Sequence, residues 1–449
     1  MTRVGFYIRC EAPKLTTILG LATVAITFYG AANFIPPFYS HMYPFAWYGL
    51  ILFLDGILWW KWDESLIFQR FPEFVTLCFW SAMLWFFFEV WNLRLQNWYY
   101  VGTPDGRVWP HIEAYIDFAT VLPGMFLLYR LLCKLNLPKE RTSKRLPAAH
   151  VASISTLIGT VMVGLVAAFP DYFFPFVWGA FVFLLEPLLA KTKAPSLLRN
   201  AVKGQWTPFF RLLMAGFLAG IYWELCNFWS LEKWVYTVPF FAEGKLFEMP
   251  YLGFLGFPPF CVECFVITNA VYLLRSGKHW NPEWHHRSRP PFRYRIAYVV
   301  LIGMSVCLAE WSYDKMQYHT VDSRAQTLPQ AVDDIDATIG RLLYRNGWKY
   351  PQSALNDWNA AATLIPGPLH QRFRRRLELV TLLHMGSKNA RLLERIGIRS
   401  RGQLAAQNPD RLFTRLARAN RLSTLRKRPL LKRRVRAWVN AAQRKSLLY

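Results

Sequence analysis

The sequence has few cysteines, and their spacing excludes the common structural zinc sites. Seven cysteines occur in 449 residues, and all of them precede residue 314. Zinc sites often use two C-x-x-C groups, whereas Cys261 and Cys264 form a single one. This pair lies in an apolar run after Pro258 and Pro259, so we interpret it as core packing rather than redox or metal chemistry. We predict no metal site and no cofactor.

Acidic residues are also scarce. The chain has 28 Asp and Glu against 53 Lys and Arg, which gives a net charge of +25, and only 18% of its residues are charged. In contrast, 53% are hydrophobic and 17% aromatic, and the apolar residues cluster into runs that short basic loops separate. A soluble protein with so many aromatic residues would be unusual. The pattern is typical of a polytopic membrane protein.

The apolar runs predict an all-α fold with about nine transmembrane helices. The first run begins near Leu15 and leads to Phe34 instead of a small-residue cleavage site, so we expect no cleavable signal peptide. The predicted spans are 15–35, 45–61, 74–91, 113–132, 149–169, 172–190, 209–228, 252–274 and 295–311.

The distribution of basic residues predicts the orientation. With a cytoplasmic N-terminus, the cytoplasmic segments and adjoining span ends carry 22 Arg and Lys, and the opposite loops carry 4. We therefore expect a multi-pass protein of the cell membrane, as in a bacterial inner membrane. An odd number of spans places residues 314–449 on the opposite side. The last run, from Ile296 to Ala309, has only fourteen residues, so a re-entrant or interfacial helix is the alternative there.

Two copies of one motif indicate a duplicated membrane unit. The copies are Glu89-Val-Trp-Asn92 with Trp98 and Tyr100, and Glu224-Leu-Cys-Asn227 with Trp234 and Tyr236. Further matches are Pro44-Phe-Ala-Trp47 with Pro175-Phe-Val-Trp178, Asp55 with Glu186, and Pro123 with Pro258 or Pro259. An even number of crossings separates the copies, so the duplication is parallel and relates two four-helix units.

This duplication defines the expected domains. We predict a first four-helix repeat in residues 1–140 and a second in 141–280. The last span and a linker occupy 281–325, and a basic domain occupies 326–449. A twofold relation about the membrane normal would place a shared interface between the repeats, and such interfaces favour ligand sites.

Acids in the apolar runs are the main functional clue. The strongest are Asp55, Glu89, Glu186, Glu224 and Glu263. An ionised carboxylate is costly in hydrocarbon, so these side chains should face protein or water, where they can hold or transfer a proton. The alternative is that each acid only orients its helix, and duplication copies structural residues as faithfully as catalytic ones.

The motif also predicts partners for two of these acids. Asn92 follows Glu89 by three residues and Asn227 follows Glu224 likewise, which places each acid and amide on one helical face. The aromatic residues that follow have two interpretations. They form belts at the membrane surface, or they form a wall whose ring faces stabilise a cationic intermediate on an isoprenoid ligand.

The second half resembles the membrane lycopene cyclase domain. In that family a helix ends in Trp-acid-x-x-Asn, a Trp-x-Tyr follows, and the next helix opens with Pro and an acid. Residues 172–274 carry these pieces as Trp223-Glu224, Asn227, Trp234-Val-Tyr236, Pro258-Pro259 and Glu263, and residues 45–132 repeat Glu89, Asn92, Trp98 and Tyr100. The resemblance covers about half of the membrane part.

The resemblance implies a redox-neutral, proton-initiated rearrangement of a polyene. Glu224 and Glu263 would be its acid and base, with Glu89 at the matching position of the first half. Candidate ligand-binding residues are Asn92, Asn227, Trp98, Trp234, Tyr100, Tyr236, Asp55 and Glu186. The family usually carries adjacent acids after its proline, whereas this chain has Glu263 alone in one half and no acid after Pro123 in the other. A shared scaffold that binds a ligand without chemistry is therefore the alternative.

The last 136 residues differ from the rest. They carry 27 Arg and Lys against 9 Asp and Glu, hence +18 of the total charge. Arg341-Leu-Leu-Tyr-Arg345-Asn-Gly347 recurs as Arg391-Leu-Leu-Glu-Arg395-Ile-Gly397, which predicts helices that end at glycine, and Asn408-Pro409-Asp410 opens another helix. The pattern is similar to tandem helix-hairpin-helix domains of poorly understood type. It suggests an anionic polymer, nucleic acid, membrane lipid headgroups or an acidic protein as partner.

Three functional hypotheses remain. The protein binds a hydrophobic, isoprenoid-like ligand between its repeats, with or without acid–base chemistry. It is a noncatalytic subunit or scaffold whose basic tail recruits a partner. It is a proton-coupled transporter or channel that uses the buried acids.

Overall fold

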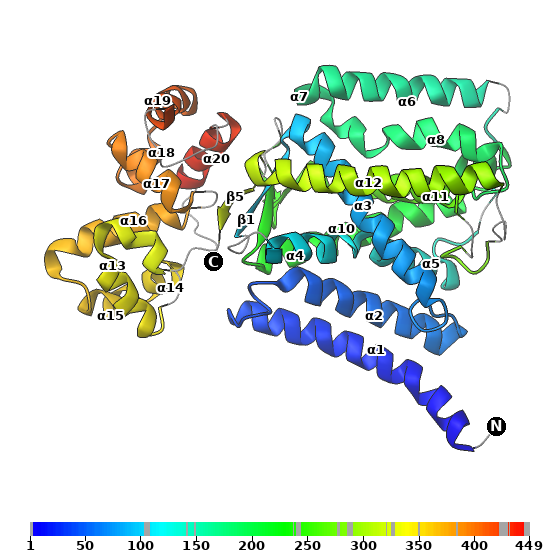
Figure 1. The fold of residues 1–449 in the computed structure, drawn as a ribbon, viewed down its shortest axis with the longest axis horizontal. Coiled ribbons are helices and arrows are strands. Elements are labelled where there is room, and N and C mark those ends of the chain that lie inside the picture. The colour runs from blue at the N-terminus through cyan, green and yellow to red at the C-terminus, as the bar shows by residue number, and fades with distance from the viewer. Residues whose placement is uncertain are drawn as a thin grey trace. The chain divides into compact units, whose positions relative to one another are not determined.

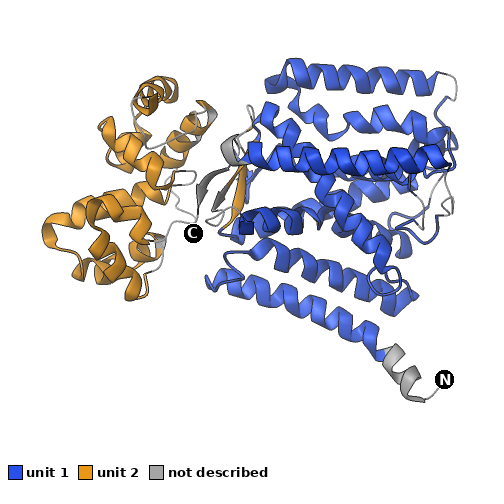
Figure 2. Cartoon of the chain, in the orientation of Figure 1, with its two compact units in different colours: residues 1–97, 106–231, 240–317 blue, residues 98–105, 232–239, 318–449 orange. Residues whose placement is uncertain are grey.

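The chain forms two compact units. The computed structural model describes residues 3–102, 108–140, 142–147, 150–236, 238, 244–275, 279–284, 291–319, 321–324, 328–348, 351–382, 385–421, 430 and 432–443. Unit 1 comprises residues 1–97, 106–231 and 240–317, and unit 2 comprises residues 98–105, 232–239 and 318–449 (Figure 2). Unit 1 holds the membrane helices, and unit 2 holds the basic domain.

The described part of unit 1 contains nine helical segments that are long and apolar enough to cross a membrane. This confirms the predicted all-α, multi-pass fold, and each segment coincides with a predicted span. The segments are α1 (Arg3–Ala32), α2 (Met42–Trp62), α3 (Phe71–Leu95), α4 (Val108–Phe118) with α5 (Val121–Lys134), α6 (Val151–Ala168), α7 (Pro170–Phe173) with η1 (Phe174–Trp178) and α8 (Ala180–Ala190), α10 (Thr207–Trp229), η2 (Tyr251–Gly256) with α11 (Phe257–Tyr272), and α12 (Phe292–His319).

The last helix is longer than its apolar run. Helix α12 continues beyond the fourteen residues from Ile296 to Ala309, and its apolar segment extends over 25 residues from Phe292 to Met316. At a rise of 1.5 Å per residue this segment is about 37 Å long, which exceeds the hydrocarbon thickness of a typical bilayer. By length, α12 is therefore a full span rather than a re-entrant helix.

Hydrogen bonds between loops show which helix ends lie together. The guanidinium of Arg70, before α3, donates to the backbone carbonyl of His279, which follows α11. In the second half, the N–H of Ser143 donates to the Gly204 carbonyl over 3.0 Å, and the indole of Trp206 donates to the Lys144 carbonyl over 2.8 Å. The connections after the even-numbered spans therefore meet in pairs at one end, as alternating crossings require.

The helices that carry the duplicated motif begin in the same way. Helix α3 has Pro72 and helix α10 has Pro208 in the first turn, where a proline costs no helical hydrogen bond. Figure 1 shows the hairpin of α1 and α2 at one edge of unit 1 and that of α6 and α8 at the opposite edge, with α3, α5, α10 and α11 between them. Two small elements complete the unit, α9 (Leu197–Val202) and the strand pair β3 (Lys245–Leu246) and β4 (Met249–Pro250).

The Trp-x-Tyr segments of the two repeats pair with each other in unit 2. Strand β1 (Trp98–Gly102) lies between β2 (Lys233–Tyr236) and β5 (Val321–Arg324), antiparallel to β2 and parallel to β5. Trp98 pairs with Tyr236, and Tyr100 pairs with Trp234. The tryptophan of each segment thus pairs with the tyrosine of the other, which is the reciprocal pattern that a twofold axis produces. Duplicated segments of the predicted membrane repeats therefore belong to the unit of the C-terminal domain.

The rest of unit 2 is helical and packs around its own apolar core. Its helices are α13 (Leu328–Arg345), α14 (Pro351–Asn356), α15 (Trp358–Thr363), η3 (Gly367–Leu369), α16 (His370–Val380), α17 (Gly386–Arg395), α18 (Arg401–Ala405), α19 (Pro409–Arg421) and α20 (Lys432–Gln443). Fully buried side chains at its centre include Leu343, Phe373, Leu393 and Trp438.

Glycine ends two of these helices, as the sequence repeat predicts. Gly347 follows α13 with φ at 102°, and Gly397 follows α17 with φ at 87°. The N–H group after each glycine donates a hydrogen bond to a leucine carbonyl in the last turn of the helix. Trp348 donates to Leu343 over 3.2 Å, and Ile398 donates to Leu393 over 3.0 Å. The left-handed conformation favours glycine, so this prediction is confirmed. The prediction for α19 is confirmed as well, because the Asn408 side chain accepts the N–H groups of Asp410 and Arg411.

One buried arginine joins three helices of unit 2. Arg376 on α16 is 1% exposed, and its Nε lies 2.7 Å from Oε1 of Glu394 on α17. Its two terminal nitrogens lie 2.5 and 2.9 Å from the carboxylate oxygens of Asp334 on α13. Partial burial alone would raise the pKa of Asp334, but the hydrogen bonds and charge of Arg376 lower it. The arginine therefore links α13, α16 and α17.

We predict that Arg376→Gln destabilises this helical part of the full-length protein by about 2–3 kcal/mol, because Glu394 loses its cation and Asp334 retains only Arg391, at 3.2 Å. The loss is smaller than for a fully buried triad, since the carboxylates are partly exposed. Hydrogen exchange of the α13 and α17 amides measures the change. Arg375→Gln, at the exposed neighbouring position, is the control. Equal exchange rates in the two variants would contradict the assignment.

Candidate functional site: a buried acidic interface between the repeats

Aromatic rings from the two halves of unit 1 meet in matched pairs. Trp47 of the first half lies 5.7 Å from Trp223 of the second, measured between ring centroids. At the corresponding positions, Trp178 of the second half lies 5.3 Å from Phe88 of the first. The same two sequence positions thus meet twice across the interface, which is the contact pattern expected of a pseudo-twofold pair.

Further rings extend this aromatic interface. Trp85 on α3 lies 5.0 Å from Trp223 on α10 and 5.9 Å from Phe260 on α11. Phe260 in turn lies 5.3 Å from both Phe88 and Trp178. These edge-to-face and tilted contacts hold the halves together by aromatic packing.

Glu89 is held within the first half by its own helix. Its Oε1 accepts the indole N–H of Trp85 over 3.1 Å, and its Oε2 accepts the amide of Asn92 over 3.4 Å. The acid–amide pair expected from the motif therefore forms. Asn92 has a second role, because its side-chain oxygen accepts the N–H of Asn97 over 3.0 Å, beyond the end of α3. Both residues are fully buried.

Glu224 follows the interface residue Trp223 on α10. It and Asn227 are buried on α10, and the neighbouring Tyr222 donates its hydroxyl to the Ala46 carbonyl of the first half over 2.8 Å. Tyr43 of the first half lies 5.8 Å from the ring of Trp223, the residue before Glu224, measured between ring centroids.

Glu263 meets a helix start inside the membrane. The sixth span is not one continuous helix: the 3-10 segment η1 ends at Trp178, and α8 begins at Ala180. A helix start leaves N–H groups without helical partners. The N–H of Phe181 donates to Oε1 of Glu263 over 2.8 Å, so the acid on α11 completes this turn of α8. Oε2 of Glu263 is buried and has no hydrogen-bond partner among the described residues.

The first half has neither the break nor the acid. Helix α2 continues from Met42 to Trp62, through the region that matches η1 and α8. The position matching Glu263 is a leucine, Leu127 or Leu128, depending on which proline is matched with Pro123. The break and the acid occur together in the second half only. Glu263 is therefore a difference between the copies and not a residue that duplication retained.

Asp55 and Glu186 hold equivalent loops. The Asp55 carboxylate accepts the hydroxyl of Ser65 at 2.5 Å and the N–H of Leu66 at 2.7 Å. Glu186 accepts the hydroxyl of Ser196 at 2.7 Å and the N–H of Leu197 at 3.0 Å, ten and eleven residues onward as in the first half. These bonds give both carboxylates a structural role in the connections after the second and sixth spans. Their assignment as ligand-binding residues stays a prediction.

The remaining candidates lie in unit 2. Trp98 and Tyr100 on β1 and Trp234 and Tyr236 on β2 form the strand pair, and the Trp234 indole donates to the Tyr236 hydroxyl over 2.7 Å. Their presence in paired strands explains the repeated Trp-x-Tyr spacing in structural terms.

Several residues of this interface were not identified from the sequence. Nothing in the sequence marks Trp85 or Phe181, because one tryptophan or one backbone N–H in an apolar helix cannot be distinguished from the others. Ser65 and Ser196 did leave a signal. Each begins a Ser-Leu pair ten residues after its acid, and comparison of the two halves reveals it.

Comparison with known proteins identifies one region. Residues 336–445 match the family model of a domain of unknown function (DUF4332). The match lies within the basic C-terminal part and assigns no activity. No curated protein and no solved structure matches the chain.

We predict that Glu263→Leu, which restores the residue type of the first half, lowers the stability of the protein in detergent by about 1–3 kcal/mol. The buried N–H of Phe181 would then have no acceptor. Glu263→Gln retains a carbonyl oxygen at this position and should change stability much less. Thermal unfolding of both variants separates the effects. If the leucine variant unfolded at the same temperature as the wild type, the hydrogen bond would have no structural role.

Proposed function

We propose that the membrane part binds an extended apolar ligand of the isoprenoid class between its two halves, with Glu263 and Glu224 as the acidic groups of the site. The observation that carries this proposal is the Oε2 atom of Glu263, which is buried without a hydrogen-bond partner among the described residues. Burying such an oxygen is costly, and side chains retained at that cost in a membrane usually have a function.

The surroundings of the acids support this class of ligand. Ring faces of tryptophan and phenylalanine attract positive charge, and they offer an apolar surface to a polyene. Because the rings of the two halves are already in contact, the ligand must separate at least one ring pair on binding. A start of α8 within the membrane adds oriented N–H groups at the repeat interface, a feature of ligand sites in other repeat proteins.

The chemistry that suits these groups is proton transfer. A protonated carboxyl group adds its proton to a carbon–carbon double bond, and the resulting carbocation closes or shifts onto a neighbouring double bond. Loss of a proton from an adjacent carbon to a carboxylate gives the isomeric product, so atoms and electrons balance without an oxidant. The lycopene cyclase resemblance assigns the acid and base to Glu224 and Glu263, and Glu89 is the corresponding acid of the first half.

Expression in a lycopene-accumulating host tests this activity by pigment analysis. We expect a new isomeric pigment with the wild-type protein and at least tenfold less product with Glu224→Gln or Glu263→Gln, because removing a general acid or base typically costs about 10²–10⁴ in rate. Glu140→Gln changes a largely exposed carboxylate and is the matched control. Unchanged pigments with lycopene and with several other linear polyenes would exclude cyclase activity.

A second candidate function is recruitment of an anionic partner by unit 2. Many of its basic side chains are exposed, and no ion pair is found for them among the described residues: Arg341, Arg345, Arg372, Arg375, Lys388, Arg395, Arg399, Arg411, Arg418 and Arg421. Arg376, by contrast, is paired with carboxylates inside the unit. With the N-terminus in the cytoplasm, this surface would act on the opposite side of the membrane.

Co-purification in mild detergent tests recruitment. The full-length chain should retain a partner that is lost when residues 326–449 are deleted and that dissociates as salt is raised. Replacement of Arg372 and Arg375 by Gln should weaken retention, whereas Arg376→Gln acts through folding and serves as the contrast. A chain that purifies alone at low salt would remove this candidate.

A further inference from the structure

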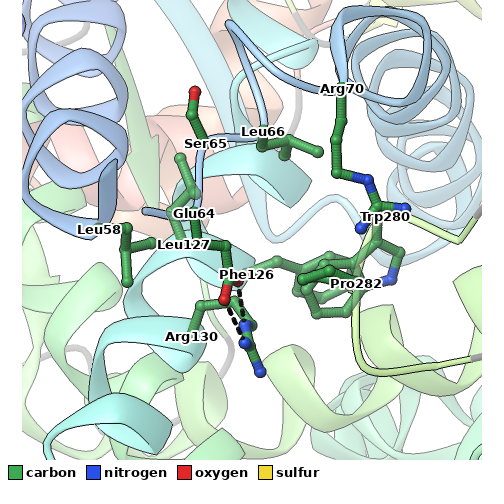
Figure 3. Close-up of a pocket in the computed structure, with 10 residues that line it drawn as sticks. All are labelled: Leu58, Glu64, Ser65, Leu66, Arg70, Phe126, Leu127, Arg130, Trp280 and Pro282. Atoms are coloured by element: carbon green, nitrogen blue, oxygen red, sulfur yellow. Dashed lines mark hydrogen bonds and ion pairs between the residues drawn. The ribbon is translucent and has the colours of Figure 1, made fainter. Parts of the chain in front are cut away.

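A small pocket lies where the second, fourth and eighth spans end at one side of unit 1. Its lining includes Arg70, Trp280, the ion pair of Arg130 with Glu64, and an apolar wall of Leu58 and Phe126 (Figure 3). The space inside accommodates about one water molecule. Figure 3 shows the Arg130–Glu64 pair at one side of the pocket and Arg70 with Trp280 at the other.

The other cations of this region are matched by carboxylates. Arg130 binds Glu64 through two nitrogens, each at 2.7 Å, and Glu283 at 2.9 Å. Lys134 lies 2.9 Å from the same Glu64 carboxylate. Burial alone would raise the pKa of Glu64, but its hydrogen bonds with Arg130 and Lys134 lower it. The cations Arg130 and Lys134 are therefore already paired with carboxylates of the chain and do not need a further anion.

Arg70 makes no direct ion pair among the described residues, and Glu64 and Glu73 act on it only at longer range. No carboxylate lies within 4 Å of it among the described residues, and its bond to a protein acceptor is to the neutral carbonyl of His279. Its Nη1 atom is buried and lacks a hydrogen-bond partner in the described structure. Arg70 is only partly buried as a residue, but its Nη1 donor is enclosed, and an enclosed donor without an acceptor is unfavourable unless an acceptor from outside the chain approaches it.

A second donor faces the same pocket. The Trp280 side chain is 3% exposed, and its indole nitrogen is likewise buried without a partner among the described residues. The neighbouring His279 cannot serve it, because its Nδ1 accepts the N–H of Asn281 over 3.1 Å and its Nε2 faces Asn269 over 3.0 Å. Two N–H donors, one of them cationic, are therefore available at one pocket.

We propose that Arg70 and Trp280 bind one oxygen of a phosphate group at this end of the membrane part. Guanidinium groups bind phosphate through strong charge-assisted hydrogen bonds, and an indole N–H adds a neutral donor. The pocket is too small for a whole headgroup, so the rest of the phosphate lies outside it. The apolar wall of Leu58 and Phe126 suits the chain of a phospholipid, and free inorganic phosphate shares the same oxygen chemistry. This site is separate from the acids between the repeats.

Thermal unfolding of the delipidated full-length protein tests the proposal. The probes are phosphatidylglycerol and phosphatidylcholine in mixed micelles, and inorganic phosphate against chloride at equal ionic strength. Trp280→Phe removes the indole donor alone, and Arg70→Gln removes the charge. Lys61→Gln changes an exposed cation at the same end of α2 and controls for general attraction of anions.

We expect a phosphate-bearing probe to raise the unfolding temperature of the wild type and of Lys61→Gln. Its apparent affinity should fall roughly tenfold in Trp280→Phe and further in Arg70→Gln. A gain with phospholipid but not with inorganic phosphate identifies a lipid headgroup, and a gain with inorganic phosphate identifies a free anion. If Arg70→Gln does not fold, Trp280→Phe decides. The proposal is overturned if Trp280→Phe responds as the wild type does, or if no probe stabilises the wild type.

Discussion

The cost of a carboxyl group in an apolar medium is the constraint on which this structure depends. Glu89, Glu224 and Glu263 are all fully buried in membrane helices. Hydrocarbon offers no hydrogen-bond donor, so the protein must provide one. It does so with an indole and an amide for Glu89, and with a backbone N–H from the start of α8 for Glu263. The bonds of Glu89 stay within α3, whereas the bond of Glu263 joins α11 to the start of α8.

Duplication explains most of this arrangement, and its exceptions indicate the site. The carboxylate and serine pairs of Asp55 and Glu186 hold equivalent loops, and the ring pairs across the interface are reciprocal. Features that occur twice need no function beyond the fold. Glu263 occurs once, together with the break before α8, so duplication alone does not account for it. Glu263 thus distinguishes the second half from the first, and the proposed ligand site combines it with Glu224, whose counterpart Glu89 occupies the matching position of the first half.

The sequence predicted the membrane fold well because long apolar runs leave little freedom, and the predicted spans coincide with the nine helical segments observed in the described residues. It also predicted the glycine ends at Gly347 and Gly397, which depend on local backbone conformation alone. Other features depend on distant partners. A one-dimensional reading cannot distinguish a carboxylate that closes a loop, as Asp55 does, from one that faces a ligand. The pairing of the two Trp-x-Tyr segments as strands depends on contact between residues that are distant in the sequence. The full length of α12 could not be predicted from its short apolar run, because the helix continues into polar residues.

The central claim is that an apolar ligand separates the aromatic rings beside Glu263 and Glu224. An experimental map of the full-length protein, purified from membranes that contain polyenes, tests it most directly. The account predicts elongated density between α3 and α10 or α11, with Trp85 and Trp223 or Phe88 and Phe260 moved apart and one end of the ligand near Oε2 of Glu263. Ring pairs that remain in contact, with no density between the halves and a water molecule on Oε2, would contradict it.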